Sequence, residues 1–290
     1  MQAPPTGFAA MFKDLLVPLS GNPADADAIR AALDMALHFD AHLALLEIVA
    51  LPLPAASPWG LSPDVAMDGL YRRLRAQAEV NAEKRRRELA DSGVPHEVRV
   101  VESLFTDSAH MAAHCAQYAD LSVVAGAVDS TAEGARLHDL IAALLAHSGR
   151  PVLVVPPRNR SPRPPRHVLL AWRPSIGTTR AVHDALPLLV QAERVDVVIV
   201  DPTGGERGDG PQPGGDIATH LARHGVRANV VVRESNGRDV SPLLLEHASA
   251  MPAHLIVAGG YGHSRRREWA VGGVTRELLF GSPVPVFFSH

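Results

Sequence analysis

Several residue types and patterns are scarce in this sequence, and each shortage excludes a class of protein. The 290 residues include one cysteine, Cys115, so no internal disulfide can form and a reducing compartment is favoured. The net charge of −3 lacks the basic excess of a general nucleic-acid binder. No apolar run approaches the ~20 residues needed to span a bilayer, and residues 1–10 lack the basic start and long apolar stretch of a signal peptide. We therefore expect a cytoplasmic protein that binds neither nucleic acid nor membranes.

Apolar residues, by contrast, are plentiful enough for two hydrophobic cores. Hydrophobic residues make up 46% of the chain and charged residues 20%, a balance that is typical of globular domains. A chain of 290 residues is expected to hold two domains of roughly 130–150 residues, each large enough to bury a core of its own.

The two domains are predicted to be copies of one unit. Three pairs of similar segments recur, two of them at an offset of 134 residues and one at an offset of 153. The pairs are 119–121 with 253–255, 151–154 with 285–288, and 28–33 with 181–186. This self-similarity indicates a tandem duplication.

Short apolar runs alternate with helical patterns in both halves. Strands are predicted at residues 14–19, 43–49, 97–101, 121–125 and 152–155, then at 167–171, 195–200, 227–233, 255–258 and 284–288. Helices are predicted at 24–39, 65–92, 108–118 and 134–147, then at 178–190, 215–224, 240–250 and 272–280. Continuous Val, Leu and Ile runs separated by helices indicate parallel strands covered on both faces. The prediction is an α/β fold of two five-stranded parallel sheets, which bind ligands at the carboxyl ends of their strands.

Proline marks the boundary between the two halves. Residues 156–165 contain five prolines and suit neither a helix nor an inner strand, so we expect a semi-extended linker. The predicted division is a first domain at 1–157, a linker at 158–165 and a second domain at 166–290. The loops 51–63 and 201–214 follow the second strand of each half and are expected to lie over the ligand edge, although such loops are more often solvated insertions.

A glycine pattern after the fourth strand of the second half carries the functional signal. Residues 259–262 (Gly-Gly-Tyr-Gly) follow an apolar run, and residues 272–275 (Gly-Gly-Val-Thr) open the next helix. A glycine turn lets the backbone approach a ligand closely, and a helix start points unpaired N–H groups at the same place. This arrangement predicts an anionic ligand, most simply a nucleotide.

These residues resemble a tandem universal stress protein. The resemblance rests on the strand and helix order and on the spacing Gly259-x2-Gly262-x9-Gly272. It implies Rossmann-like (HUP-type) domains, often paired through their last strands, and in one subgroup ATP or another adenine nucleotide, with Mg²⁺ only where the nucleotide is bound. By this resemblance the ligand contacts fall on Gly259, Gly262, His263, Ser264, Gly272, Gly273, Val274 and Thr275.

Two positions depart from the nucleotide-binding members. Gly273 stands where a Ser or Thr offers its hydroxyl to a phosphate, so Ser264 or Thr275 would have to replace that oxygen. Trp172 and Arg173 stand where such members carry an Asp near the base and ribose. In the first half Leu19 and Ser20 take that place.

The first half has no glycine cradle. An offset of 134 places Ala125, Val128, His138 and Asp139 where the second half has Gly259, Gly262, Gly272 and Gly273. Side chains would fill the phosphate space, and Asp139 would repel an anion. We expect no nucleotide in the first domain.

Other candidate residues have plainer explanations. His110 and His114 have a metal-binding spacing and precede Cys115, yet without further ligands a structural role is favoured, as it is for His38 and His42. We expect no Arg or Lys near Cys115 to lower its pKa, and therefore an inert, packed thiol. Trp172 is expected to belong to the core rather than to stack on a base, and residues 265–267 (Arg-Arg-Arg) fit either phosphate contacts or a solvated turn.

No group in the sequence predicts catalysis. There is no nucleophile with its base, no carboxylate pair and no Lys after the glycines, so we expect neither an enzyme nor a metal site. The favoured interpretation is a stress-response module whose second domain binds an adenine nucleotide. A scaffold that binds other proteins and no nucleotide is the alternative, and slow ATP hydrolysis lacks a catalytic group. The last strands of the two domains are expected to pair within the chain, and a homodimer is left open.

Overall fold

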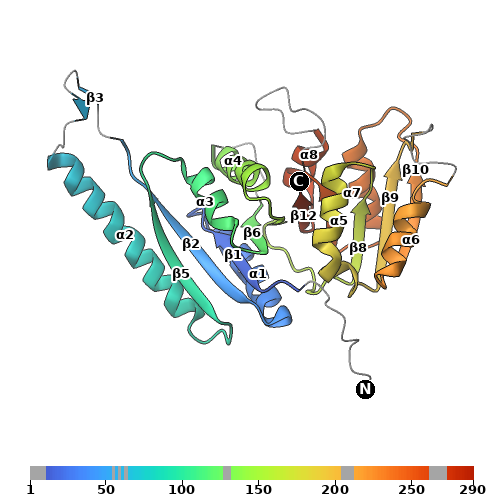
Figure 1. The fold of residues 1–290 in the computed structure, drawn as a ribbon, viewed down its shortest axis with the longest axis horizontal. Helices are drawn as coiled ribbons and strands as arrows, with labels where there is room; N and C mark the ends of the chain where they lie inside the picture. The colour runs from blue at the N-terminus through green and yellow to red at the C-terminus, as the bar shows by residue number, and fades with distance from the viewer. Residues whose placement is uncertain are drawn as a thin grey trace. The chain divides into compact units, whose positions relative to one another are not determined.

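The computed structural model describes residues 11–53, 56–57, 60–61, 65–126, 132–203, 212–260 and 273–290. These residues form two compact units, which we call the first domain (residues 13–158) and the second domain (residues 159–290, with residues 11 and 12). Figure 1 shows strands and helices alternating along the chain in both domains. Each domain is described by itself below.

The first domain contains a parallel sheet in the order β7-β6-β1-β2-β5. Its strands are β1 (Asp14–Pro18), β2 (His42–Ala50), β5 (His96–Ser103), β6 (Leu121–Ala125) and β7 (Val152–Val155). Its helices are α1 (Asp25–Phe39), α2 (Val65–Leu89), α3 (Ser108–Ala116) and α4 (Ala132–His147).

The second domain repeats this arrangement with the order β10-β9-β8-β11-β12. Its strands are β8 (His167–Ala171), β9 (Arg194–Val200), β10 (Ala228–Arg233), β11 (Leu255–Gly259) and β12 (Val286–Ser289). Its helices are α5 (Ile176–Leu189), α6 (Gly215–Arg223), α7 (Val240–Ala250) and α8 (Gly273–Gly281). The predicted α/β fold of two five-stranded parallel sheets is therefore confirmed.

The helices cover both faces of each sheet. In the first domain α3 and α4 contact each other, and in the second α7 and α8 do so. Right-handed crossovers put the other two helices of each domain on the opposite face, and Figure 1 draws α5 and α6 in front of β8 and β9. This double cover explains why the central strands contain so little polar sequence: Val168, Leu169 and Leu170 of β8 are all fully buried.

Several elements begin or end a few residues from their predicted bounds, and two further differences alter the local structure. The proline-rich loop 51–63 contains a short antiparallel pair, in which β3 (Ala56–Ser57) faces β4 (Gly60–Leu61) across a two-residue connection. Helix α5 begins two residues before the predicted start because the Ser175 hydroxyl accepts a hydrogen bond from the Thr178 N–H and so caps the helix. Among the described residues, no helix has the length and apolar character that crossing a membrane requires.

Candidate functional site

The candidate site is the edge of the second-domain sheet at which its parallel strands end. Strand β8 ends at Ala171 and is followed by Trp172, while β11 ends at Gly259 and β12 at Ser289. Helix α5 is the next helix after β8, and α8 is the next helix after β11, as the alternating topology requires. Open α/β sheets bind their ligands at this edge, so the strand order itself selects these residues.

Helix α5 packs directly on the end of β11. A Cβ atom on Gly259 would lie 2.6 Å from the Thr178 backbone nitrogen and 2.9 Å from the Gly177 carbonyl carbon. A Cβ on Gly177 would in turn lie 3.2 Å from the Gly260 oxygen. The first motif glycine is therefore required by the packing of a helix on a strand, whether or not a ligand binds.

The end of β12 is fixed to the same edge by hydrogen bonds. The Gly260 N–H donates to the Ser289 carbonyl at 2.7 Å, and the His290 ring Nδ1 lies 2.9 Å from the Gly260 carbonyl. The Ser289 hydroxyl donates to Asp184 of α5 at 2.5 Å. These contacts join β11, β12 and α5 along one side of the site.

The start of α8 is the second described part of the predicted cradle. Gly273 is exposed, and a Cβ atom there would meet no heavy atom of the described residues within 4 Å. Val274 is half-buried, and Thr275 is buried at 4% exposure. The Thr275 side chain therefore faces the protein, which argues against its replacing the phosphate-binding hydroxyl that Gly273 lacks.

Four of the predicted contacts lie outside the described residues: Gly262, His263, Ser264 and Gly272. The three arginines at 265–267 lie outside them as well. Of the eight predicted ligand contacts, the structure therefore describes Gly259 at the end of β11 and Gly273, Val274 and Thr275 at the start of α8.

Trp172 is not the core residue that the sequence analysis expected. Its backbone N–H donates to the Val198 carbonyl at 2.9 Å, which holds the backbone against β9, but its side chain is only half-buried. Nearby in the sequence, Ile176 opens α5 with 81% of its surface exposed. The expectation failed because Trp172 follows the last residue of β8 and therefore lies past the buried part of the strand.

In the first domain the corresponding loop is occupied by the protein's own carboxylate. Asp25 is buried and accepts hydrogen bonds from the N–H groups of Ser20 and Gly21 and from the Ser20 hydroxyl. Burial raises the Asp25 pKa, although these hydrogen bonds oppose the increase. Donors that could face an anion in the loop between β1 and α1 already have an internal acceptor. Asp139, which the offset of 134 pairs with Gly273, is largely exposed, but it lies inside α4, seven residues after that helix begins, whereas Gly273 is the first residue of α8.

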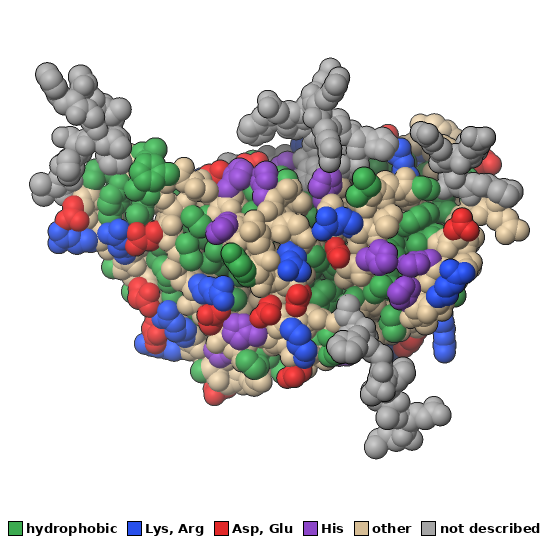
Figure 2. Space-filling view, viewed as in Figure 1, with side chains coloured by type: hydrophobic (Ala, Val, Ile, Leu, Met, Phe, Trp, Pro, Cys, Tyr) green, Lys and Arg blue, Asp and Glu red, His purple; other side chains and the backbone are tan. Residues whose placement is uncertain are grey.

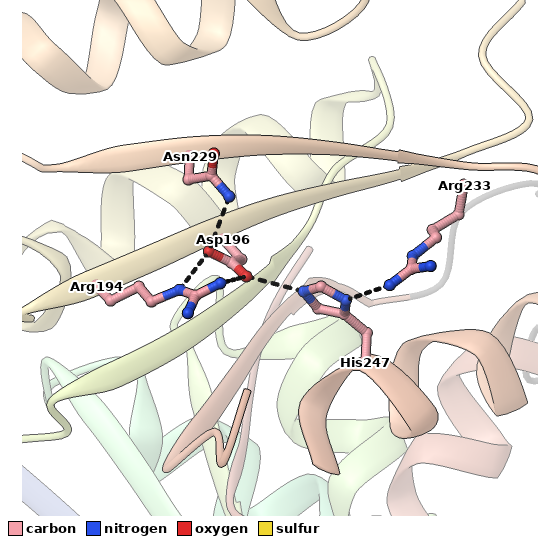
Figure 3. A network of polar contacts seen from close by, with 5 residues as sticks. All are labelled: Arg194, Asp196, Asn229, Arg233 and His247. Atoms are coloured by element: carbon pink, nitrogen blue, oxygen red, sulfur yellow. Dashed lines mark hydrogen bonds and ion pairs between the residues drawn. The ribbon is translucent and has the colours of Figure 1, made fainter. Parts of the chain in front are cut away.

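A charged network that the sequence analysis did not identify lies inside the second domain (Figure 3). Asp196 of β9 is fully buried and accepts two hydrogen bonds from Arg194, both at 2.8 Å. It also accepts hydrogen bonds from His247 of α7 at 2.9 Å and from Asn229 of β10 at 3.3 Å. Desolvation alone would raise the Asp196 pKa, but the bonds from Arg194, His247 and Asn229 outweigh it and the pKa is lowered.

The hydrogen-bond partners of His247 determine which of its ring nitrogens carries a proton. Its Nδ1 lies 3.1 Å from an Arg233 guanidinium nitrogen, which can only donate, so Nδ1 is the acceptor. The Nε2–H therefore donates to Asp196, and the ring is the neutral Nε2–H tautomer. Asp196 is the third residue of β9 and therefore lies toward the amino end of that strand, and its hydrogen bond to His247 holds α7 on the sheet. The signal in the sequence was a lone Asp inside an apolar strand.

The remaining predicted candidates have structural partners. The Asp107 carboxylate accepts from the His110 backbone N–H and contacts the His110 ring at 2.6 Å, which caps α3. The His110 ring also lies beside that of His147, with centroids 4.8 Å apart. For Cys115, burial raises the thiol pKa. The expectation that no Arg or Lys lies near Cys115 is wrong, because β5 brings Arg99 close enough to oppose that increase.

Comparison with known proteins places this architecture among the universal stress proteins. The model of the Universal stress protein family matches residues 11–156. A universal stress protein from Archaeoglobus fulgidus is 15% identical, with 94% of this chain and 95% of that one covered at a TM-score of 0.68. A universal stress protein from Pseudomonas aeruginosa is also 15% identical, with 96% and 93% covered at a TM-score of 0.55. Among curated proteins none matches.

The family match and the glycine motif fall in different domains. The matched residues 11–156 cover the first domain, which lacks the cradle, whereas the glycine spacing lies at 259–272. The structural likenesses extend over both halves and, at 15% identity, show the fold alone. Together they show two HUP-type domains in tandem.

Proposed function

This chain belongs to the universal stress protein family, and we propose that it is a nucleotide-binding member whose second domain binds an adenine nucleotide in the cytoplasm. The nucleotide's phosphates would lie at the start of α8 and its base beside Trp172. The first domain carries no nucleotide in this proposal. The protein acts as a binding module for the stress response and not as an enzyme.

One observation carries the proposal: Gly273, the first residue of α8, brings neither a side chain nor a charge to the start of the helix, whereas the first domain has Asp139 at the equivalent sequence position. Gly273 leaves its side-chain position empty, and the N–H groups of a helix's first turn have no partner within the helix. The partial positive charge of a helix N-terminus stabilises a phosphate by typically 0.3–1 kcal/mol at an exposed site. An acid at residue 273, as the first domain has at the equivalent sequence position, would oppose that attraction.

The other end of the ligand would rest on apolar surface. Trp172 is half-buried and Ile176 is 81% exposed, and both follow β8 at the same edge of the sheet. An indole ring can stack on an adenine base, and such stacking does not need the acidic residue that other nucleotide-binding members carry. Recognition of the ribose would then be weaker, since no carboxylate is available at this position to accept from its hydroxyls.

The test is thermal unfolding of the full chain with ATP, ADP or AMP, each with and without Mg²⁺. Wild-type protein is expected to be stabilised by RT ln(1 + [L]/Kd), which rises with the logarithm of ligand concentration once the ligand exceeds its Kd. Gly273→Asp copies the first domain and is expected to abolish that stabilisation without harming the fold, since an acid suits the first turn of a helix. Gly273→Ser is the matched control and is expected to bind at least as tightly as wild type.

Three outcomes would contradict the proposal. If no adenine nucleotide stabilises wild type, the chain is not a nucleotide binder. If Gly273→Asp folds and binds as wild type does, the ligand lies elsewhere. If Trp172→Ala binds ATP unchanged, the base does not stack on Trp172. A tenfold loss of affinity would remove about 1.4 kcal/mol of ligand-induced stabilisation at saturation.

The scaffold function has one observation in its favour. Phe105, just beyond the end of β5, is 79% exposed, and Tyr118, just beyond α3, is 74% exposed. Aromatic side chains are enriched where proteins bind each other. If no nucleotide binds, replacing both residues with Ser should abolish capture of the physiological partner and leave the unfolding temperature unchanged.

A further inference from the structure

A histidine side chain joins the amino ends of two neighbouring strands in the second domain. The chain has 15 histidines, and because Figure 2 shows several of them at the surface, only their contacts can distinguish a functional one. The Arg166 and His167 N–H groups lie 3.2 and 3.3 Å from the Nδ1 atom of His254. A backbone N–H can only donate, so Nδ1 accepts both hydrogen bonds and the ring proton is on Nε2.

The first domain has a carboxylate in the same place. The Asp120 Oδ2 atom accepts hydrogen bonds from the Lys13 N–H at 2.7 Å and from the Asp14 N–H at 3.1 Å. Asp120 stands 134 positions before His254, and its two donors stand 153 positions before theirs. The Asp120 N–H also donates to the Asp14 carbonyl at 2.8 Å, and the His254 N–H donates to the His167 carbonyl at the same distance. An Asp oxygen and a His Nδ1 are each bonded to Cγ, so the two side chains reach equivalent donors.

Protonation of His254 and these hydrogen bonds exclude each other. Because Nε2 already carries a proton, a second proton can enter only at Nδ1, where it would meet the two N–H donors. A charged His254 would therefore leave the Arg166 and His167 N–H groups without their acceptor, at a cost in free energy. A carboxylate has no such conflict, because it accepts hydrogen bonds as an anion and stays ionised between about pH 5 and about pH 7.5.

The groups that face His254 add to this conflict. His167, the first residue of β8, stacks on the His254 ring, with centroids 5.2 Å apart and planes inclined by 11°. Arg166 adds a permanent positive charge from the residue before β8. Glu193, from the segment before β9, has the opposite effect, but its carboxylate already lies 3.5 Å from the Arg166 guanidinium. A second charge at His254 would thus be placed beside an existing one.

The direction of the pH dependence follows from these surroundings. Burial, followed by His167 and Arg166, lowers the His254 pKa below its ordinary value of 6.5. The contribution of His254 to stability is therefore present above that ordinary value and is lost as the pH falls through the lowered one. Residues 251–253, which lead into β11, and residues 282–285, which lead into β12, contain no charged side chain that could reverse this sign.

We propose that His254 makes the second domain sensitive to mild acid, because a proton at Nδ1 releases the Arg166 and His167 N–H groups and loosens the amino ends of β8 and β11. The first domain keeps its hydrogen bonds over the same range because it has Asp120. Strands β8 and β11 also carry the candidate site at their carboxyl ends, so acid would act on these strands from the opposite end. The proposal does not depend on nucleotide binding.

The experiment is amide hydrogen exchange of the full-length protein without ligand, followed by NMR. Rates are expressed as protection factors, which remove the intrinsic effect of pH on exchange. From about pH 7.5 to about pH 5, protection of the Arg166 and His167 N–H groups is expected to fall about tenfold. Protection of the Lys13 and Asp14 N–H groups is the control within the same molecule and should change little.

Two variants exchange the acceptors between the domains. His254→Asn keeps a neutral oxygen on Cγ at every pH, so protection of Arg166 and His167 should no longer depend on pH. Asp120→His gives the first domain the acceptor of the second, so protection of Lys13 and Asp14 should now fall about tenfold over the same range.

Three results would overturn the proposal. The first is equal protection of Arg166 and His167 at both pH values in wild type. The second is an unchanged fall in the His254→Asn variant, which would assign the acid response to another group. The third is full protection of Lys13 and Asp14 at about pH 5 in a folded Asp120→His variant. If that variant does not fold, the comparison of wild type with His254→Asn decides alone.

Discussion

The two domains have one fold, yet they use opposite chemistry at the same place inside it. In the first domain Ala44 lies beside Leu16 of the first strand, and in the second Asp196 lies beside Leu169 in the same register. On helix α3, Ala113 is buried and stands 134 positions before the buried His247 of α7. Two small apolar residues in one copy thus stand where the other copy has a charged, hydrogen-bonded pair. The comparison teaches that the fold accepts a polar side chain at this buried position provided that its hydrogen bonds are satisfied.

The ligand edges of the two domains differ in a second way. Helix α5 starts two residues earlier than its counterpart α1, given the offset of 153 that aligns them. Glycines at 177 and 259 make room for that extra length, where the first domain has Ala24 and Ala125. The motif glycine at 259 therefore distinguishes the two domains through packing, and Gly273 is the better marker of a ligand.

The largest effect is expected from removing the charge at Asp196. Asp196→Ala would leave the His247 N–H buried without an acceptor, and we expect a loss of about 3 kcal/mol in the free energy of unfolding, the low end for a broken buried pair. The low end applies because the Arg194 side chain is 51% exposed and can regain water. Urea unfolding of the full chain would measure it.

The control for that variant replaces both partners with alanine, the residue that the first domain has at both equivalent positions. Asp196→Ala combined with His247→Ala should cost less than the sum of the two single changes, with a coupling of about 1–3 kcal/mol. Additive single effects would show that the two side chains do not stabilise each other. The hydrogen bond between them would then contribute nothing to the free energy of unfolding.

A second prediction exchanges the residues at the ends of β6 and β11. Gly259→Ala places a Cβ atom 2.6 Å from a backbone nitrogen of α5, so the helix must shift, at a cost of about 1–3 kcal/mol. Ala125→Gly in the first domain removes a side chain without a clash and should cost only about 0.5–1 kcal/mol. Thermal unfolding compares the two. Equal effects would contradict the argument that helix packing explains Gly259.

Most of the fold followed from the sequence because apolar periodicity reports burial directly. Strands β6, β7 and β8 and helix α7 begin and end at the predicted residues, since each is a buried run with clear ends. Less of the candidate site could be predicted from the sequence. Whether Gly259 serves packing or a phosphate depends on where α5 begins, and that start depends on the Ser175 cap. The Asp196 network joins residues 51 positions apart, a contact that no local pattern encodes.

The two buried acids should give the domains opposite responses to acid. Burial raises the folded-state pKa of Asp25 above its ordinary value of 3.8, so its contribution to stability becomes more favourable as pH falls through the raised pKa. The Asp196 pKa is lowered despite its burial, so its contribution is present above its unfolded-state pKa and is lost as pH falls through the lowered one. Urea unfolding of wild type against Asp25→Asn and against Asp196→Asn should give difference curves of opposite slope. Parallel curves would contradict both assignments.

The smallest effect is expected at Gly273, where the comparison separates fold from ligand. Gly273→Ala adds a Cβ that meets no heavy atom of the described part of the chain within 4 Å and reduces the freedom of the unfolded chain, so we expect a gain of about 0.5 kcal/mol in stability. Alanine adds no charge, so stabilisation by ATP should persist in this variant although Gly273→Asp loses it. Thermal unfolding with and without ATP measures both quantities in one experiment. A loss of stability without ligand would mean that Gly273 is required by the fold, and the start of α8 would then mark packing, as Gly259 does.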